Sequence, residues 1–155
     1  MVLDINVDAA EARQSALRML ARREHSRREL HDKLLHKGCS DAIAAETVKR
    51  LEQERLISDD RFMEALIQAR RNRGYGPLRI QKELQEKGVA TEAIENGLDV
   101  SGAGWIEELQ RVRSKKFGSR LPEDYSERAR QTRFLQYRGF TYDQIKTVLN
   151  SREQD

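Results

Sequence analysis

Three histidines and a single cysteine are the residues with which this chain could carry out covalent or metal chemistry. The histidines are His25, His31 and His36, and the cysteine is Cys39. His31 and His36 are five positions apart, so on one helix they diverge too far to share a metal ion. Cys39 follows a glycine and has no evident base beside it. We interpret the histidines as exposed or helix-end side chains and expect no metal ligands among these residues.

Two short motifs have simpler structural interpretations. The pair Asp59-Asp60 stands where a helix should begin, a position at which carboxylates cap the helix and complement its dipole. The stretch "GYGP" from Gly74 lacks the preceding strand and the following Lys-Ser/Thr pair of a phosphate-binding loop, and favours a turn. The sequence assembles no nucleophile, base and oxyanion donor. We therefore predict that the protein is not an enzyme and uses no cofactor.

The basic residues give a stronger signal because they are clustered. The chain carries 29 basic and 26 acidic residues, a net charge of +3, but residues 111–138 hold nine basic residues against three acidic ones. Two arginine groups, "ARRE" from Ala21 and "ARRN" from Ala69, both fall where a first helix should give way to a second. Repeated positive charge along one side of a protein suits a polyanion, either DNA or a carboxylate-rich partner surface. The competing interpretation is that these are ordinary solvated helix faces.

We take the clustered cations as the candidate contact residues for a partner or DNA, on electrostatic grounds alone. They are Arg22, Arg23, Arg27 and Arg28 in the first part of the chain, Arg70, Arg71, Arg73 and Arg79 in the middle, and Lys115, Lys116, Arg128, Arg130 and Arg133 in the last.

Helices must position these side chains, because apolar residues recur at helical spacing from Asp8 onward. Ser26 with Glu29 forms a capping-box pattern, Ser40 or Asp41 and Ser58 or Asp59 open the next helices, and Pro77 suits a first helical position. The residues predicted to face inward are Ala12, Ala16, Leu17, Leu20, Ala21, Leu30, Leu34, Leu35, Ile43, Thr47, Val48, Leu51, Phe62, Leu66, Ala69, Ile80, Leu84, Ile94, Leu98, Trp105 or Ile106, Leu109, Val112, Phe117, Ile145, Val148 and Leu149.

A helix ending recurs three times along the chain. Gly38, Gly88 and Gly139 lie 50 and 51 residues apart, each has a leucine four positions before it, and each has an isoleucine five or six positions after it. Glycine in this place fits the left-handed residue that ends a helix. The sequence predicts an all-α fold of three tandem three-helix repeats, helix-turn-helix-like units with boundaries 1–57, 58–100 and 101–155. Because one such unit is marginal alone, we expect the repeats to pack into an elongated, curved rod.

Sequence-specific reading of DNA is not favoured, although three-helix units suggest a recognition helix. The segment "TEAIENGLDV" (91–100) has three acids and no base, so phosphates would repel it. Only "YDQIKTVLNSR" in the third repeat is mildly basic.

The cysteine content and the N-terminal sequence indicate where the protein works. One cysteine excludes an internal disulfide and fits a reducing compartment. The stretch "MVLDINVDAA" has no basic region and no long apolar run, which argues against a signal peptide or a membrane span. We expect a cytoplasmic monomer with no membrane contact.

Three blocks of this sequence resemble the RecX family, the regulators of the bacterial RecA recombinase, over residues 13–150. The blocks are "ALRMLARREHSRRELHDKLLHKG", "LISDDRFMEALIQARRNRGYGPLRIQKELQEKG" and "FLQYRGFTYDQI". No single motif is decisive, but three in this order and spacing are specific together. Met63 departs from the pattern, where the family usually has a small residue, and we interpret it as repacking.

The resemblance implies a negative modulator without enzymatic activity. Family members bind along the groove or at the end of the RecA filament on single-stranded DNA, and limit filament extension, ATP hydrolysis, strand exchange and the co-protease activity of the SOS response. The resemblance does not indicate which individual residues make these contacts. The alternative is a nucleic-acid-binding protein that competes directly for single- or double-stranded DNA, although the modest net charge predicts weak binding to bare DNA.

Overall fold

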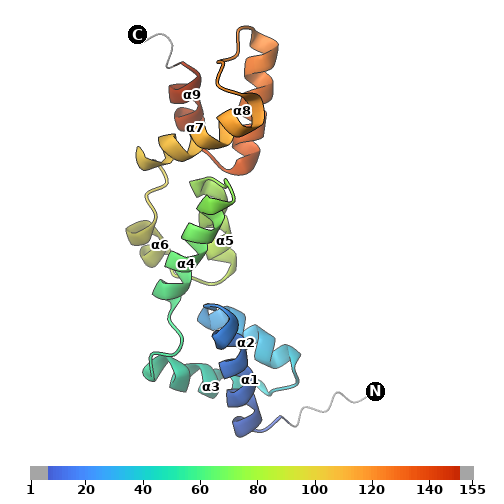
Figure 1. Cartoon of the computed structure of the whole chain (residues 1–155). Coiled ribbons are helices and arrows are strands. Elements are labelled where there is room, and N and C mark those ends of the chain that lie inside the picture. Colours follow the sequence, from blue (N-terminus) through green and yellow to red (C-terminus); the bar gives the residue numbers. More distant parts are fainter. Residues whose placement is uncertain (1–6, 151–155) are drawn as a thin grey trace. The chain divides into compact units, whose positions relative to one another are not determined.

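The computed structural model describes residues 7–150, and within this range the chain is helical with no strands (Figure 1). The all-α prediction is therefore confirmed. The helices are α1 (Ala9–Arg22), α2 (Arg27–His36), α3 (Asp41–Gln53), α4 (Asp59–Asn72), α5 (Pro77–Glu86), α6 (Thr91–Gly97), α7 (Gly104–Phe117), α8 (Tyr125–Arg138) and α9 (Tyr142–Leu149). Among these helices none is both long and apolar enough to cross a membrane.

Short polar side chains begin most of these helices by accepting a hydrogen bond from a first-turn N–H, as helix caps do. Ser40 and Ser58, rather than the aspartates that follow them, cap α3 and α4. Thr141 and Gln144 form a complete capping box at α9. The capping box predicted at α2 is only half present: Ser26 accepts from the Glu29 N–H, but the Glu29 carboxylate binds Arg23 and Lys87 instead.

The three repeated glycines all adopt the left-handed conformation that the pattern predicts. Gly38, Gly88 and Gly139 have φ values of 101°, 81° and 103°. The leucine four positions before each glycine is fully buried in every case. The sequence repeat is thus a repeat of one structural device, a buried leucine followed by a tight helix ending.

The first and third repeats each pack three helices around a core. Helices α1, α2 and α3 contact one another, and so do α7, α8 and α9. The core of the first repeat contains Ala12, Ala16, Leu30, Leu34, Cys39, Ala44, Val48, Leu51 and Ile57. In the third repeat Trp105, not Ile106, is the buried member of the predicted pair.

Several predicted inward residues are in fact exposed or only half-buried. Leu35 is 38% exposed, and Ala21 and Ala69 also face solvent. Met63, one position beyond Phe62, is buried. The α4 face that is covered therefore includes Phe62, Met63 and Leu66, but not Ala69.

The described chain divides into two compact units. One comprises the chain up to Ala65 together with Gln85–Ala93, and the other comprises Leu66–Leu84 and the chain from Ile94 onward. The second repeat contributes to both units. The predicted repeat boundaries after residues 57 and 100, and the predicted rod, stay predictions.

Inside the first unit, a buried polar cluster ties α2 to the segment Gln85–Ala93. Ser26, which has no solvent exposure, donates its hydroxyl to the Lys87 carbonyl at 2.7 Å. The Glu29 carboxylate accepts from Lys87 at 3.0 Å and from Arg23 at 2.8 Å. We call Arg23, Ser26, Glu29 and Lys87 the Glu29 cluster.

Inside the second unit, two glycine-containing turns dock backbone to backbone. The Gly76 N–H donates to the Arg138 carbonyl at 2.7 Å, and the Leu78 N–H donates to the Gly139 carbonyl at 2.9 Å. The turn before α5 is thereby held against the turn between α8 and α9.

Candidate functional site

Several of the predicted contact arginines are neutralised within the first unit. Arg23 binds Glu29 with both guanidinium nitrogens, at 3.0 and 2.8 Å. Arg27 lies 3.1 Å from Glu52 and 3.3 Å from Asp59. These arginines stabilise the fold through ion pairs, and the partner carboxylates offset much of their positive charge.

Burial alone would raise the pKa of Glu29, but the hydrogen bonds from Arg23 and Lys87 outweigh it and hold this pKa at about 2. Glu29 is only 7% exposed. The carboxylate is therefore ionised at neutral pH and fully engaged by its two cations.

In the second unit, the arginines at the end of α4 also have intramolecular partners. Arg70 forms a bidentate pair with Glu83 at 2.6 and 2.8 Å. Arg71 stacks on Trp105, 4.6 Å from the ring centre, and lies 3.7 Å from Glu108. Arginines of the "ARRE" and "ARRN" motifs thus form ion pairs within the protein. Their partner carboxylates lie outside the two motifs, so the motifs alone do not indicate these pairs.

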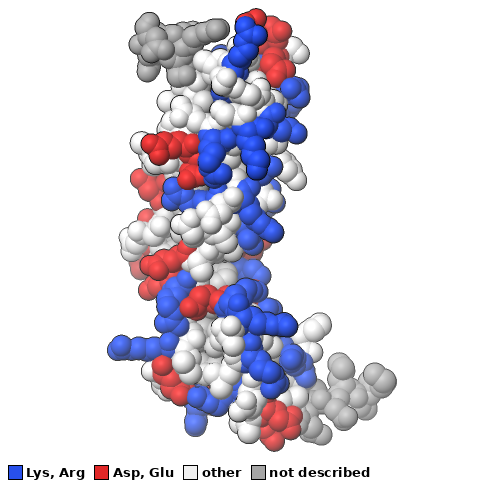
Figure 2. Space-filling model, viewed as in Figure 1, with Lys and Arg blue, Asp and Glu red and all other residues white. Residues whose placement is uncertain are grey.

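Among the predicted cations of α8, Arg130 pairs with Glu127 at 3.0 Å, and Arg128 donates to the side-chain oxygen of Asn150. The remaining predicted cations form no ion pair with any described residue. They are Arg22 and Arg28 in the first unit and Arg73, Arg79, Lys115, Lys116 and Arg133 in the second. We call these seven residues the unpaired set. Figure 2 shows basic and acidic side chains interleaved over much of the surface, with Lys and Arg gathered over α7 and α8.

A cluster in which cations lie over aromatic rings was not predicted from the sequence. Arg79 lies 3.9 Å from the ring centre of Tyr75 and 5.6 Å from that of Tyr137. Arg138, which was not among the predicted contact residues, lies over both Tyr75 and Phe134. The sequence places Tyr137 beside Arg138, but Tyr75 is more than sixty residues away, so only the fold brings them together.

A second missed residue is Arg113, which is 4% exposed on α7. Its guanidinium donates to the carbonyls of Ser119 and Arg120 and to the side chain of Gln131. Burial lowers its pKa, and its Nε has no hydrogen-bond partner among the described residues. Arg113 holds the loop after α7 against α8, which is a structural role.

The histidines and the cysteine do not form a reactive centre. His25 lies at a helix end, between Arg23 at the end of α1 and the Ser26 cap of α2, but it is buried. Its Nδ1 lies 3.0 Å from the Arg23 carbonyl and its Nε2 lies 2.9 Å from Lys33. Burial is the main cause that lowers the pKa of His25. Cys39 belongs to the core, and its burial raises the thiol pKa. Within residues 7–150 no group of three or more His, Cys, Asp or Glu side chains could hold a metal ion.

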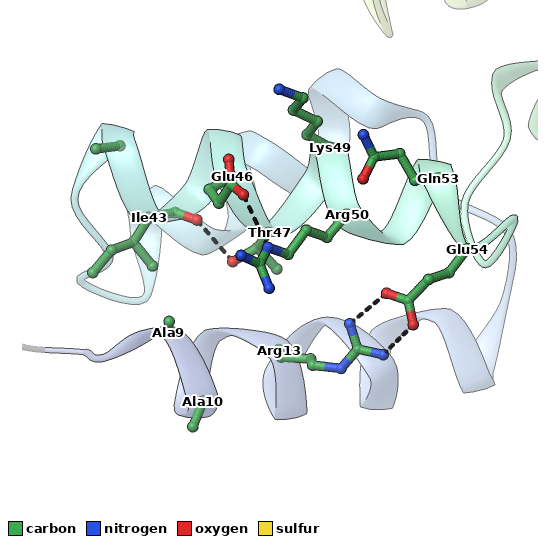
Figure 3. Close-up of a pocket in the computed structure, with 11 residues that line it drawn as sticks. Ala9, Ala10, Arg13, Ile43, Glu46, Thr47, Lys49, Arg50, Gln53 and Glu54 are labelled. Carbon is green, nitrogen blue, oxygen red and sulfur yellow. Dashed lines mark hydrogen bonds and ion pairs between the residues drawn. The ribbon is translucent and has the colours of Figure 1, made fainter.

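An open groove of about 910 Å³ runs between α1 and α3 (Figure 3). Its lining is small or aliphatic at one end, with Ala9, Ala10 and Ile43, and charged at the other. Four of the charged side chains there form two ion pairs, Arg13 with Glu54 and Arg50 with Glu46, and Lys49 also lines the groove. The groove has no pair of groups placed for acid–base or nucleophilic chemistry.

Comparison with known families matches all three repeats of this chain. Residues 12–51 match the model for the first three-helix domain of RecX, residues 58–98 the second, and residues 106–149 the third.

Curated relatives and solved structures agree with these matches. The chain is 43% identical over 143 residues to the regulatory protein RecX of Pseudomonas putida strain GB-1, with 92% of each chain covered. It is 40% identical over 148 residues to that of Halorhodospira halophila, covering 95% of this chain and 92% of the relative. The crystal structure of RecX from Lactobacillus salivarius superposes with a TM-score of 0.78 at 21% identity, over 95% of this chain and 97% of that one. Another crystal structure of regulatory protein RecX gives 0.73 at 17% identity, over 92% and 73%.

Proposed function

Because the chain belongs to the RecX family of regulatory proteins, we propose that it is a negative modulator of the RecA recombinase. It binds the filament that RecA forms on single-stranded DNA, along the groove or at the end. Binding limits filament extension, ATP hydrolysis, strand exchange and the co-protease activity. The protein acts by binding and not by catalysis.

Tandem repeats suit such a target because a filament repeats the same surface. Several weak contacts on one chain, each to a neighbouring protomer, combine into useful affinity without any single strong site. Attraction between surface charges speeds the encounter and makes it sensitive to salt.

The unpaired set is the observation that supports this surface most directly. Arg23, Arg27, Arg70 and Arg130 have carboxylates within 3.3 Å, so a partner gains little from them. Arg28 and Arg73, in contrast, are exposed and form no ion pair with any described residue. We propose that the filament contacts are made by the unpaired set.

Sedimentation of the protein with preassembled RecA filaments tests this proposal. Reversing Arg28 and Arg73 to Glu together is expected to weaken retention about tenfold, because attraction becomes repulsion at two contact points. These positions are better choices than Arg70, whose reversal would set two carboxylates against each other at Glu83.

The matched control reverses Lys49 and Lys146, which are also exposed, form no ion pair with the described residues, and give the same change in net charge. The control should stay within about twofold of the parent protein, because neither lysine belongs to the cation clusters from which the unpaired set is drawn. If both double variants lost retention equally, binding would depend on net charge alone. That result would contradict the assignment of the filament contacts to the unpaired set.

The second candidate function is direct competition for DNA. It is favoured by one specific observation, the cations stacked on aromatic rings in the second unit. It predicts that inhibition of RecA appears only when the strand is covered by this protein.

A further inference from the structure

We propose that the second unit carries a binding site for single-stranded nucleic acid, on which a base stacks on Tyr137 while neighbouring cations hold the phosphates. The site comprises Tyr75, Arg79, Lys116, Phe134, Tyr137 and Arg138, and we call it the stacking ladder. It adds a contact to the strand itself, which the proposed binding to RecA does not require.

The ladder alternates rings and cations across three helices and a turn. Lys116 of α7 lies 5.5 Å from the ring centre of Phe134 on α8, and Arg138 lies 5.2 Å from the same ring. Arg138 also lies 5.3 Å from the ring centre of Tyr75, which Arg79 of α5 covers at 3.9 Å. Each cation is thus held by an aromatic face and stays positively charged, because a ring does not neutralise it as a carboxylate would.

Tyr137 is the outermost ring of the ladder and the one that offers a free surface. Its side chain is 74% exposed, although an aromatic ring gains free energy by burial. Arg79 lies 5.6 Å from its ring centre, near enough to reach the phosphate of a nucleotide whose base stacks there. Phe134 is half-buried, and its ring packs edge-to-face against Phe117 with the two ring centres 5.3 Å apart. It therefore forms a rigid support for the other rings of the ladder.

The rigid backbone under the ladder comes from the docked glycine turns. Arg138 donates its guanidinium to the Arg73 carbonyl at 3.1 Å, and its own carbonyl accepts from the Gly76 N–H. These bonds fix the Tyr75 turn against the end of α8. The stacking ladder is therefore preorganised by the fold, which lowers the entropy cost of binding.

The surroundings are positive and contain little competing acid. Arg79, Lys116, Arg138 and the nearby Arg133 form no ion pair with any described residue. The one acid on α8, Glu127, is engaged by Arg130 and Gln131. The hydrogen bond from Arg130 is the main cause that lowers the pKa of Glu127.

A single strand fits this chemistry better than a duplex or an acidic protein. Bases of a single strand are free to stack on an exposed ring, and such stacking depends little on sequence. A duplex hides its base faces and would use only the cations. A carboxylate-rich protein would likewise leave the exposed Tyr137 ring without a function.

Fluorescence anisotropy with a short labelled oligothymidylate at low salt tests the site on the full chain without RecA. Tyr137→Ala is expected to weaken binding about tenfold, since loss of a stacked base is typically of that order. Tyr137→Phe keeps the ring and should bind within about twofold of the parent protein. Tyr142→Ala, which removes a tyrosine that is 59% exposed outside the ladder, is the matched control and should also be unchanged.

Three further probes separate the sources of affinity. An abasic strand of the same length should bind more weakly than oligothymidylate and show no difference between the parent protein and Tyr137→Ala. Binding of a duplex should likewise be unaffected by Tyr137→Ala, and poly-glutamate should bind less tightly than oligothymidylate. Equal loss in Tyr137→Ala and Tyr142→Ala, an abasic strand bound as tightly as oligothymidylate, or preference for poly-glutamate would overturn the proposal.

Retention of the same variants on RecA filaments distinguishes this failure from failure of the proposed function. A protein that binds filaments but not free strands would refute the stacking ladder alone. A protein that binds strands through Tyr137 but leaves RecA unaffected would support the ladder and refute the proposed function.

Discussion

Gly139→Ala is expected to destabilise the second unit by about 3 kcal/mol, as a sum of backbone strain and steric overlap. Gly139 has a φ of 103°, a conformation that side chains with a Cβ rarely adopt. A Cβ there would lie 2.6 Å from the Arg79 Cβ and 2.8 Å from the Arg79 backbone nitrogen. The docked turns would have to separate, and this would disrupt the stacking ladder.

Urea unfolding followed by circular dichroism measures this loss. Gly76→Ala separates its two causes, because Gly76 has no positive φ but its Cβ would lie 2.5 Å from the Gly139 carbonyl carbon. We expect a loss of about 2 kcal/mol there, from overlap alone. Gly104→Ala is the matched control: nothing lies within 4 Å of its Cβ, and stability should be unchanged or slightly increased. Gly139→Ala as stable as Gly104→Ala would contradict the docking of the two turns.

Acid is expected to destabilise the first unit through Glu29. The pKa of Glu29 is about 2 in the folded protein against 4.5 for an unperturbed glutamate. A depressed folded pKa stabilises the protein above the unfolded value, and this contribution disappears as the pH falls from 4.5 towards 2. The full shift corresponds to about 3 kcal/mol, and the partial exposure of Arg23 and Lys87 reduces this to roughly 2 kcal/mol.

Glu29→Gln should therefore lower the unfolding free energy by about 2 kcal/mol at neutral pH, and should flatten its fall in acid. The measurement is urea unfolding at a series of pH values. Glu46→Gln provides the control, because Glu46 is exposed and pairs only with the exposed Arg50. An identical acid dependence in the parent protein and Glu29→Gln would show that the ion pairs of Glu29 with Arg23 and Lys87 do not stabilise the first unit.

The fold could be predicted well because its signals are local. A glycine that ends a helix, a serine that begins one and a leucine one turn from the glycine each act within a few residues. Gly38, Ser40 and Leu34 are examples where sequence and structure agree. The prediction that Leu35 and Ala69 face inward is wrong. Helical spacing locates the buried face of a helix only to within about one residue, and the neighbouring helices decide which edge of that face is covered.

The candidate site was less predictable because charge at a surface depends on distant partners. Glu29 binds Lys87 from 58 positions away, and Arg27 binds Asp59 from 32 positions away. No local pattern marks such pairs, so Arg23 and Arg27 looked as available as Arg28. The stacking ladder was missed for the same reason, since Tyr75 and Arg138 meet only after the turns dock.

Titration of this protein into RecA that hydrolyses ATP on single-stranded DNA tests whether the RecA filament is its target, with binding to the same DNA measured in parallel. If the filament is the target, ATP hydrolysis should fall at concentrations of this protein well below that of RecA, while binding to the bare DNA stays weak. Inhibition that begins only once the DNA is saturated by this protein would contradict that account and establish competition for the strand.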